Sequence, residues 1–116
     1  MVVLGIDIGG MHMRAGMVDE KGAILASRTV AMPADIEGFV PSLHDAIRWL
    51  MEATSLPAGA GIGCKGIIDP DSTRVSTLPG ALHFLEGLCL SELVGLPADV
   101  PVFADNDARA ALAPAA

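Results

Sequence analysis

The chain has 116 residues, of which 52% are hydrophobic, and fourteen acidic residues against seven basic ones give it a formal net charge of −7. This length fits one domain or one piece of a larger protein, and the negative charge disfavours nucleic acid and anionic membrane surfaces as partners. No apolar run approaches the roughly 20 residues that cross a bilayer, so we expect no membrane partner.

The two cysteines and the first residues indicate a cellular location. Cys64 and Cys89 belong to no CxxC or Cys/His cluster, which predicts reduced thiols and a cytoplasmic protein. Residues 1–4 lack the basic region, the long apolar region and the cleavage site of a secretory signal. We expect them to open a strand instead.

Three short apolar runs lead the chain, and turn-forming residues separate them. The runs span residues 2–8, 13–18 and 23–32. The turns are Gly9-Gly10 and residues 20–22. Short runs joined by tight turns predict an antiparallel meander of three strands.

The pattern then changes to the spacing of one helix face, with apolar residues at steps of four and three. These residues are Ile36, Val40, Leu43, Ile47 and Leu50. Asp35 can cap a helix at this point, and Leu56-Pro57 ends it. Because Pro41 has no backbone N–H to donate, the regular helix should either begin near Pro41 or bend there, and a beginning near Pro41 is the favoured interpretation.

The second half of the chain alternates between extended and helical patterns. Residues 58–63 and Ile67-Ile68 predict a buried strand broken by a glycine-rich turn, and residues 69–85 predict a loop. The elements expected after it are a short helix within 88–96, a strand at 100–104 and a helix at 108–113. A meander followed by alternating elements predicts an α/β fold in which helices cover a mixed sheet.

Asp7-Ile8-Gly9-Gly10 is the first of three candidate sites. Without Cβ atoms, Gly9 and Gly10 let backbone amides approach a phosphate, and Asp7 beside them can hold a magnesium ion through water. The structural interpretation is a turn in which glycine supplies a positive φ. From these four residues alone, that interpretation is the favoured one.

Residues 61–66, Gly-Ile-Gly-Cys-Lys-Gly, are the second candidate, because glycine at a strand end lets a ligand touch the main chain. They match neither the G-x-x-x-x-G-K-[ST] phosphate loop nor a G-x-G-x-x-G motif opening a helix, since residues 67–70 have an extended pattern. A structural turn with a solvated Lys65 is the favoured interpretation.

Asp105-Asn106-Asp107 is the third candidate and lies between a predicted strand and a predicted helix. Such junctions line crevices at the carboxyl ends of strands, where a carboxylate can accept a proton from a substrate hydroxyl. Asp and Asn are also the preferred helix caps. General-base chemistry and capping are therefore equally favoured by these residues.

The remaining polar and large side chains predict packing rather than chemistry. His12, His44 and His83 have no metal-site spacing with cysteines or carboxylates. Trp49 is expected at the edge of the core, and the scattered methionines are expected to fill gaps in it.

In this order and at these separations, the motifs resemble the ROK family of sugar kinases and related repressors, within the actin-like ATPase superfamily. The family's D-I-G-G-T-K and A-G-x-V-D segments are matched by Asp7, Ile8, Gly9, Gly10, Ala15, Gly16, Val18 and Asp19. Its G-I-G-x-P-G-x-V-D segment is matched by Gly61, Ile62, Gly63, Gly66 and Asp69. Its N-L-P-G-W and E-N-D-A-x-A-A segments are matched by Leu78, Pro79, Gly80, Asn106, Asp107, Ala108, Ala110 and Ala111.

The resemblance implies a fold and a set of roles. The fold is the N-terminal lobe, residues 1–116, of an actin-like (ribonuclease H-like) ATPase, which encloses ATP and a hexose with a larger C-terminal lobe absent from this chain. Asp107 would be the general base on the sugar hydroxyl and would bind the sugar together with Asn106. The pocket glycines would be Gly63 and Gly66, and the residues facing the ATP phosphates and Mg²⁺ would be Asp7, Gly9 and Gly10. The family's Cys-rich zinc motif would belong to the missing lobe.

These expectations lead to three hypotheses about function. The first is a lobe of a hexose kinase, which is inactive as a fragment. When complete, such a kinase transfers the γ-phosphoryl group of ATP to a sugar hydroxyl. A first strand that begins near Met1 favours a kinase over a repressor. The second is a sugar-sensing or regulatory module, because Met11, His12 and Thr77 replace the family's usual Thr, Lys and Asn. The third is a structural actin-like lobe. In each case we expect self-association or packing against the missing lobe, since apolar surface would be exposed.

Overall fold

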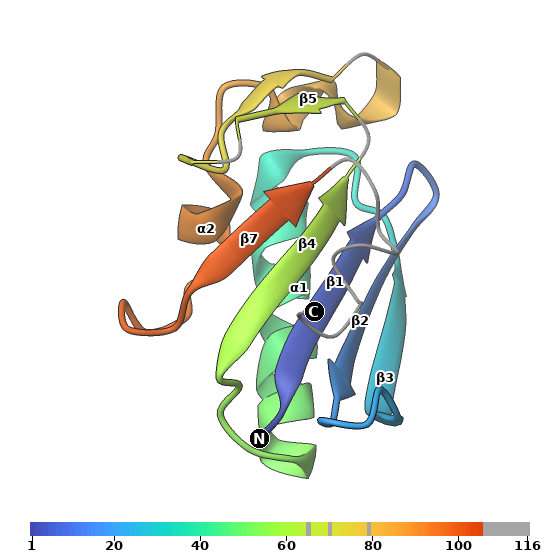
Figure 1. Cartoon of the computed structure of the whole chain (residues 1–116). Coiled ribbons are helices and arrows are strands. Elements are labelled where there is room, and N and C mark those ends of the chain that lie inside the picture. Colours follow the sequence, from blue (N-terminus) through green and yellow to red (C-terminus); the bar gives the residue numbers. More distant parts are fainter. Residues whose placement is uncertain (65, 70, 79, 106–116) are drawn as a thin grey trace.

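A computed structural model describes residues 1–64, 66–69, 71–78 and 80–105, and a five-stranded sheet forms its body (Figure 1). The strand order is β3-β2-β1-β4-β7. The strands are β1 (Val3–Ile8), β2 (His12–Val18), β3 (Ile24–Ala31), β4 (Gly59–Cys64) and β7 (Val102–Asp105). β1, β2 and β3 pair antiparallel, whereas β4 and β7 run parallel to β1. The predicted three-stranded meander within a mixed α/β sheet is therefore confirmed.

Helix α1 (Ile36–Ala53) covers one face of this sheet (Figure 1). The Asp35 carboxylate accepts a hydrogen bond from the backbone N–H of Gly38 at 2.9 Å, which caps the first turn as expected. The helix buries an apolar stripe that contains Phe39, Leu43, Ala46, Ile47 and Leu50. Burial of one such large side chain contributes about 1.5–3 kcal/mol relative to exposure, so this stripe anchors the helix.

The expectation that the helix begins near Pro41 is wrong, because Pro41 lies inside it, six residues after the cap. A proline at this position removes the N–H that would otherwise bond to the carbonyl of Glu37. Both Pro41 and Glu37 are exposed, so water can satisfy that carbonyl. The cap at Asp35 and the buried Phe39 outweigh the one lost hydrogen bond.

The main core lies between the sheet and α1. Alternate residues of the three central strands are buried, as the period of two requires. They are Leu4, Ile6, Ile8, Met13, Ala15, Met17, Ala60, Ile62 and Cys64. The expectation that methionines fill core gaps holds for Met13 and Met17 but is wrong for Met1 and Met11, which are 78% and 79% exposed.

A smaller unit follows β4 and lies at the carboxyl end of the sheet (Figure 1). It contains β5 (Ile67–Ile68), β6 (Val75–Thr77), the 3₁₀ helix η1 (Gly80–Leu85) and the short helix α2 (Leu90–Leu93). We call residues 66–69, 71–78 and 80–96 the small module. The prediction of a loop over 69–85 is wrong, because this segment contains β6 and η1 and buries Val75, Leu78, Leu82 and Leu85.

Three other expectations about this half of the chain can be compared with the structure. β5 does not continue the main sheet, because it pairs with β6 in a separate two-stranded sheet. The predicted short helix is α2, and its N-cap is Cys89. The helix predicted at residues 108–113 and the solvation predicted for Lys65 lie outside the described residues.

The side chains expected to pack at the surface do so in different ways. Trp49 is 42% exposed, and the Arg28 guanidinium carbon lies 4.9 Å from its ring centroid, so a cation from β3 covers the ring. His44 Nε2 lies 2.7 Å from the carbonyl oxygen of Leu93 and links α1 to α2. None of the helices in the described parts of the chain is long and apolar enough to cross a membrane.

Candidate active site at the carboxyl edge of the sheet

The carboxyl ends of β1, β4 and β7 meet at one edge of the sheet, because these three strands are parallel. Each of the three candidate motifs begins at or follows one of these ends. The β1–β2 turn and the small module lie beside the same edge (Figure 1). In open α/β sheets this edge is where ligands bind.

Residues from four strands form a row just inside this edge. In register order they are Arg14 of β2, Asp7 of β1, Gly63 of β4 and Asp105 of β7. Paired residues project to the same face of a sheet, and the flanking Ile6 and Ile8 are buried, so the row faces away from the core. Asp7 and Asp105 are two strand spacings of about 4.8 Å apart. Gly63, the residue between the two carboxylates in this row, has no side chain and is itself buried.

The β1–β2 hairpin uses its two glycines in different ways. A Cβ on Gly9 would lie 3.0 Å from the carbonyl oxygen of His12, and the Gly9 N–H donates to that same oxygen at 3.0 Å. A Cβ on Gly10 would meet nothing within 4 Å. Neither residue has a positive φ, so the interpretation that the turn requires glycine for that conformation is wrong. Gly9 is needed for close approach within the hairpin, whereas the space beside the Cα of Gly10 is open.

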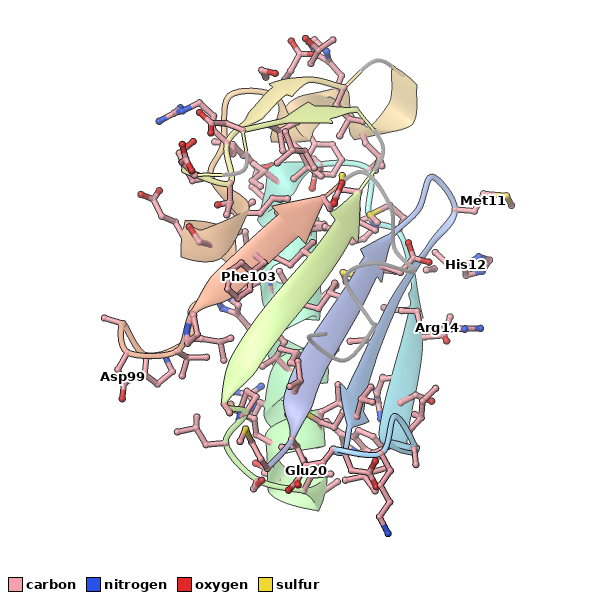
Figure 2. The ribbon with its side chains drawn as sticks, viewed as in Figure 1. Met11, His12, Arg14, Glu20, Asp99 and Phe103 are labelled. Atoms are coloured by element: carbon pink, nitrogen blue, oxygen red, sulfur yellow. The ribbon has the colours of Figure 1, made fainter. Side chains whose placement is uncertain are left out.

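The side chains after these glycines point outward. Figure 2 shows Met11, His12 and Arg14 extending from the same side of the hairpin, and all three are exposed. The backbone carbonyl of Met11 accepts a hydrogen bond from the N–H of Met32 at 2.9 Å. The exposed thioether of Met11, the residue after Gly10, supplies no strong hydrogen-bond donor.

Gly66 joins the second motif to the small module. Its φ is +108°, and a Cβ there would lie 2.3 Å from the carbonyl oxygen of Thr77 and 3.0 Å from Cδ1 of Leu78. Only glycine fits at so close an approach and at such a φ. Gly63 lies within β4 of the main sheet, whereas Gly66 lies against the backbone of Thr77-Leu78. The prediction that both line one pocket stays a prediction.

The Thr77-Leu78 backbone is held from its other side by a residue that the sequence analysis missed. The N–H of Leu78 donates to Glu86 Oε2 at 3.0 Å, and His83 Nδ1 lies 3.1 Å from the same oxygen. Leu78 is buried, whereas the Glu86 side chain is 32% exposed. The only signal in the sequence is an acid three residues after a histidine on a short helical segment, which is too common to indicate a role.

Asp69, the last residue of the second motif, forms a turn. Its Oδ1 accepts from the backbone N–H of Asp71 at 2.9 Å and of Ser72 at 3.5 Å, and these bonds, the first above all, lower the pKa of the exposed carboxyl. The turn leads into Thr73, which has an unfavourable φ of +60° for a β-branched residue. Thr73 Oγ1 donates to Ser91 Oγ and accepts from the Ser91 N–H, both at 2.9 Å, and these bonds hold the strained residue.

Cys64 ends β4 beside Ile8. Burial, and secondarily the charge of Asp7, raises the pKa of its thiol to about 11. Since the thiolate is the reactive form, this thiol is inert near neutral pH.

The third motif is described only as far as Asp105, where β7 ends. Asn106 and Asp107, the predicted sugar ligand and general base, lie outside the described residues, and their roles stay predictions.

The β1–β2 hairpin has features that a magnesium-bound nucleotide requires. Magnesium in kinase sites is held by one or two carboxylates together with substrate phosphates. Asp7 supplies one carboxylate, and the open space at Gly10 lets a phosphate approach the hairpin. No cluster of three or more His, Cys, Asp or Glu residues that would form a self-sufficient metal site occurs within residues 1–64, 66–69, 71–78 and 80–105. The hairpin therefore fits an ion brought by a nucleotide.

Comparison with known proteins identifies the class. Residues 3–116 match the sequence model of the ROK family, and the chain belongs to that family. The glucokinase of Streptomyces coelicolor is 33% identical over 110 residues, which cover 95% of this chain and 34% of the glucokinase. This chain thus spans about a third of the length of the curated relatives that it matches.

Solved structures agree with this assignment. The ROK family glucokinase from Streptomyces griseus, solved in complex with glucose and AMPPNP, superposes with a TM-score of 0.79 at 33% identity, over 95% of this chain and 34% of that one. The mixed five-stranded sheet with its helices matches the N-terminal lobe of this actin-like kinase, which confirms the predicted fold. A ROK family transcriptional regulator, a homologue of the E. coli MLC protein, has a TM-score of 0.75 at 18% identity, over 94% of this chain and 28% of that one. The regulator shares the fold alone.

Proposed function

We propose that this chain is the N-terminal lobe of an ATP-dependent hexose kinase, with glucose as the first substrate to test. The observation that carries the proposal is the register of Asp7 beside Gly63, which joins the phosphate-side and sugar-side motifs at one edge of the sheet. Glucokinase relatives at 33% identity support the same reaction and the same sugar.

In this proposal each motif has one role. The hairpin residues Asp7, Gly9 and Gly10 face the phosphates and Mg²⁺ of ATP. Gly63 and Gly66 shape the sugar pocket, and Asn106 hydrogen-bonds the sugar. A second lobe, about twice as long as this chain by the coverage of the relatives, would close over both substrates. The complete protein would work in the cytoplasm without a nucleic-acid partner.

Asp107 is the proposed general base. Its carboxylate would accept the proton of the sugar hydroxyl while the oxygen forms a bond to the γ-phosphorus and the bond from that phosphorus to ADP breaks. Phosphoryl transfer depends chiefly on positioning and charge neutralisation, so few protein groups are required. An aspartate two residues after the end of a parallel strand is well situated for such a task.

The test uses the full-length parent protein with ATP, Mg²⁺ and a panel of hexoses. We expect a sugar phosphate as the product, and we expect Asp107→Asn to lower kcat by at least about 100-fold, the lower end for a general base. Asp99→Asn is the matched control, because Asp99 is exposed in the loop before β7, at the opposite end of the sheet from the hairpin (Figure 2). Equal losses in both variants, or unchanged activity of Asp107→Asn, would contradict the assignment.

A sugar-sensing regulator is the second candidate. It is favoured by the exposed Met11 beside Gly10, at a position where the family usually has a hydroxyl-bearing threonine. Sugar binding by the parent protein without any phosphorylated product would support this candidate over the kinase. Binding of neither sugar nor nucleotide, together with concentration-dependent assembly, would support a structural lobe.

A further inference from the structure

We propose that Glu86 is a positioning residue, whose carboxylate holds the Thr77-Leu78 backbone against Gly66 and thereby sets the affinity for the sugar. The inference rests on the proposed function, since it assigns a task to a residue beside the proposed sugar pocket. It goes beyond the motifs, because Glu86 belongs to none of them.

The backbone of Thr77-Leu78 is fixed between two contacts. On one side the carbonyl of Thr77 lies so close to Gly66 that a Cβ there would be 2.3 Å away. On the other side the N–H of Leu78 donates to Glu86 Oε2 at 3.0 Å. A shift of Leu78 away from Glu86 would therefore also shift the Thr77 carbonyl that lies against Gly66.

The backbone that directly follows Glu86 is held by hydrogen bonds to β6 and its neighbours. Gly87 N–H donates to the carbonyl of Val75 at 2.6 Å, and Val75 N–H donates to the carbonyl of Leu88 at 2.9 Å. The Arg74 guanidinium donates to the Gly87 carbonyl. Residues 87–88 thus lie along β6 on the side opposite β5. The Glu86 side chain therefore extends from a backbone that is held in place.

The hydrogen bond matters because its donor has little access to water. Leu78 as a whole is only 3% exposed, and its bond to Glu86 is partly buried. A donor that loses such an acceptor stays unsatisfied or moves toward another one. The bond also involves a charged acceptor, which makes it stronger than a neutral pair.

The contact with His83 does not explain the arrangement. The His83 side chain is 72% exposed and precedes Glu86 by three residues on the same short segment. Exposed ion pairs of this kind contribute little. Removal of the His83 side chain should therefore leave the hydrogen bond between Leu78 and Glu86 intact. A variant at His83 thus distinguishes the effect of the Leu78 contact from that of the His83 contact.

The experiment compares four variants of the full-length parent protein, Glu86→Ala, Glu86→Asp, Glu86→Gln and His83→Ala. We expect Glu86→Ala and Glu86→Asp to raise KM for glucose about tenfold, the effect of one lost charge-assisted hydrogen bond. Their KM for ATP and their kcat should change little. Glu86→Gln keeps an acceptor oxygen within reach and should restore most of the affinity, and His83→Ala should resemble the wild type.

Two further readouts keep the proposal falsifiable. Unchanged KM for glucose in Glu86→Asp, or a Glu86→Gln variant as weak as Glu86→Ala, would overturn it, even where Glu86→Ala fails to fold. Hydrogen exchange at the Leu78 amide reports the contact without any turnover. If the parent protein phosphorylates no hexose, the proposed function fails. Faster exchange in Glu86→Asp than in Glu86→Gln would then still support the positioning role, and equal exchange would overturn it.

Discussion

The main sheet with α1 and the small module are stabilised in different ways. In the sheet, alternate residues such as Leu4, Ile6 and Ile8 are buried against the helix, and the pattern repeats from strand to strand. In the small module, Val75, Leu82 and Leu85 join the buried core, but individual polar contacts such as Thr73 with Ser91 and Leu78 with Glu86 also hold its short segments together. A repeated pattern tolerates local change, whereas a set of single contacts makes the geometry beside the proposed sugar pocket depend on a few residues.

The largest expected effect is on the sheet side of this comparison. Leu50→Ala removes a fully buried side chain from α1 and should lower the free energy of unfolding by about 2–5 kcal/mol. Chemical denaturation of the full-length protein checks this value. Glu52→Ala, an exposed neighbour on the same helix, should change the stability by less than about 0.5 kcal/mol. A loss below 1 kcal/mol for Leu50→Ala, by the same scale, would contradict the described core.

Gly66→Ala tests the junction between the two regions. The φ of +108° and the 2.3 Å approach to the Thr77 carbonyl predict a loss of about 2–4 kcal/mol from backbone strain and overpacking. The loss should be local, so that amide hydrogen exchange quickens at residues 66–69 and 75–78 before it quickens in β1. Gly10→Ala is the matched control for stability, because a Cβ there meets nothing within 4 Å. Similar denaturation midpoints for both variants would show that the close approach is not real.

The smallest expected effect concerns the two cysteines, one in the main sheet and one in the small module, whose reactivities can be compared directly. Cys64 ends a strand of the main sheet with its pKa raised to about 11, whereas Cys89 caps α2 in the small module and is only half-buried. At pH 8 the native protein should therefore be alkylated by iodoacetamide at Cys89 much faster than at Cys64, because the thiolate is the nucleophile. Mass spectrometry of the labelled peptides measures both rates. Preferential labelling of Cys64 would mean that the end of β4 is open.

The same difference between the two regions explains how much of the fold could be predicted. The meander and α1 follow from periodicity and from the cap at Asp35, because many residues contribute to one repeated signal. Pro41 misled the prediction of the helix start, since a local rule was outweighed by the cap and by the buried Phe39. β6 and η1 were missed because a strand of three residues and one 3₁₀ segment are too short for a period to be visible.

The candidate site was predicted only in part for a related reason. Asp7, Gly63 and Gly66 could be chosen from motifs that resemble a known family, but their meeting at one edge depends on strand order, which no local pattern contains. Glu86 could not be predicted, because its contact with Leu78 arises from the packing of residues 87–88 along β6. The general base proposed at Asp107 lies just beyond the described end of β7 and depends on the resemblance alone.

The most direct test of the account is amide hydrogen exchange of the full-length parent protein with and without saturating glucose. If the carboxyl edge of the sheet forms the sugar pocket, glucose should protect the peptides that contain Gly63, Gly66 and Thr77-Leu78. Peptides from β3, at the far side of the sheet, should exchange at an unchanged rate. Protection by glucose that is absent from residues 61–69 and 75–78 would contradict the central claim, even if the protein proves to be a kinase.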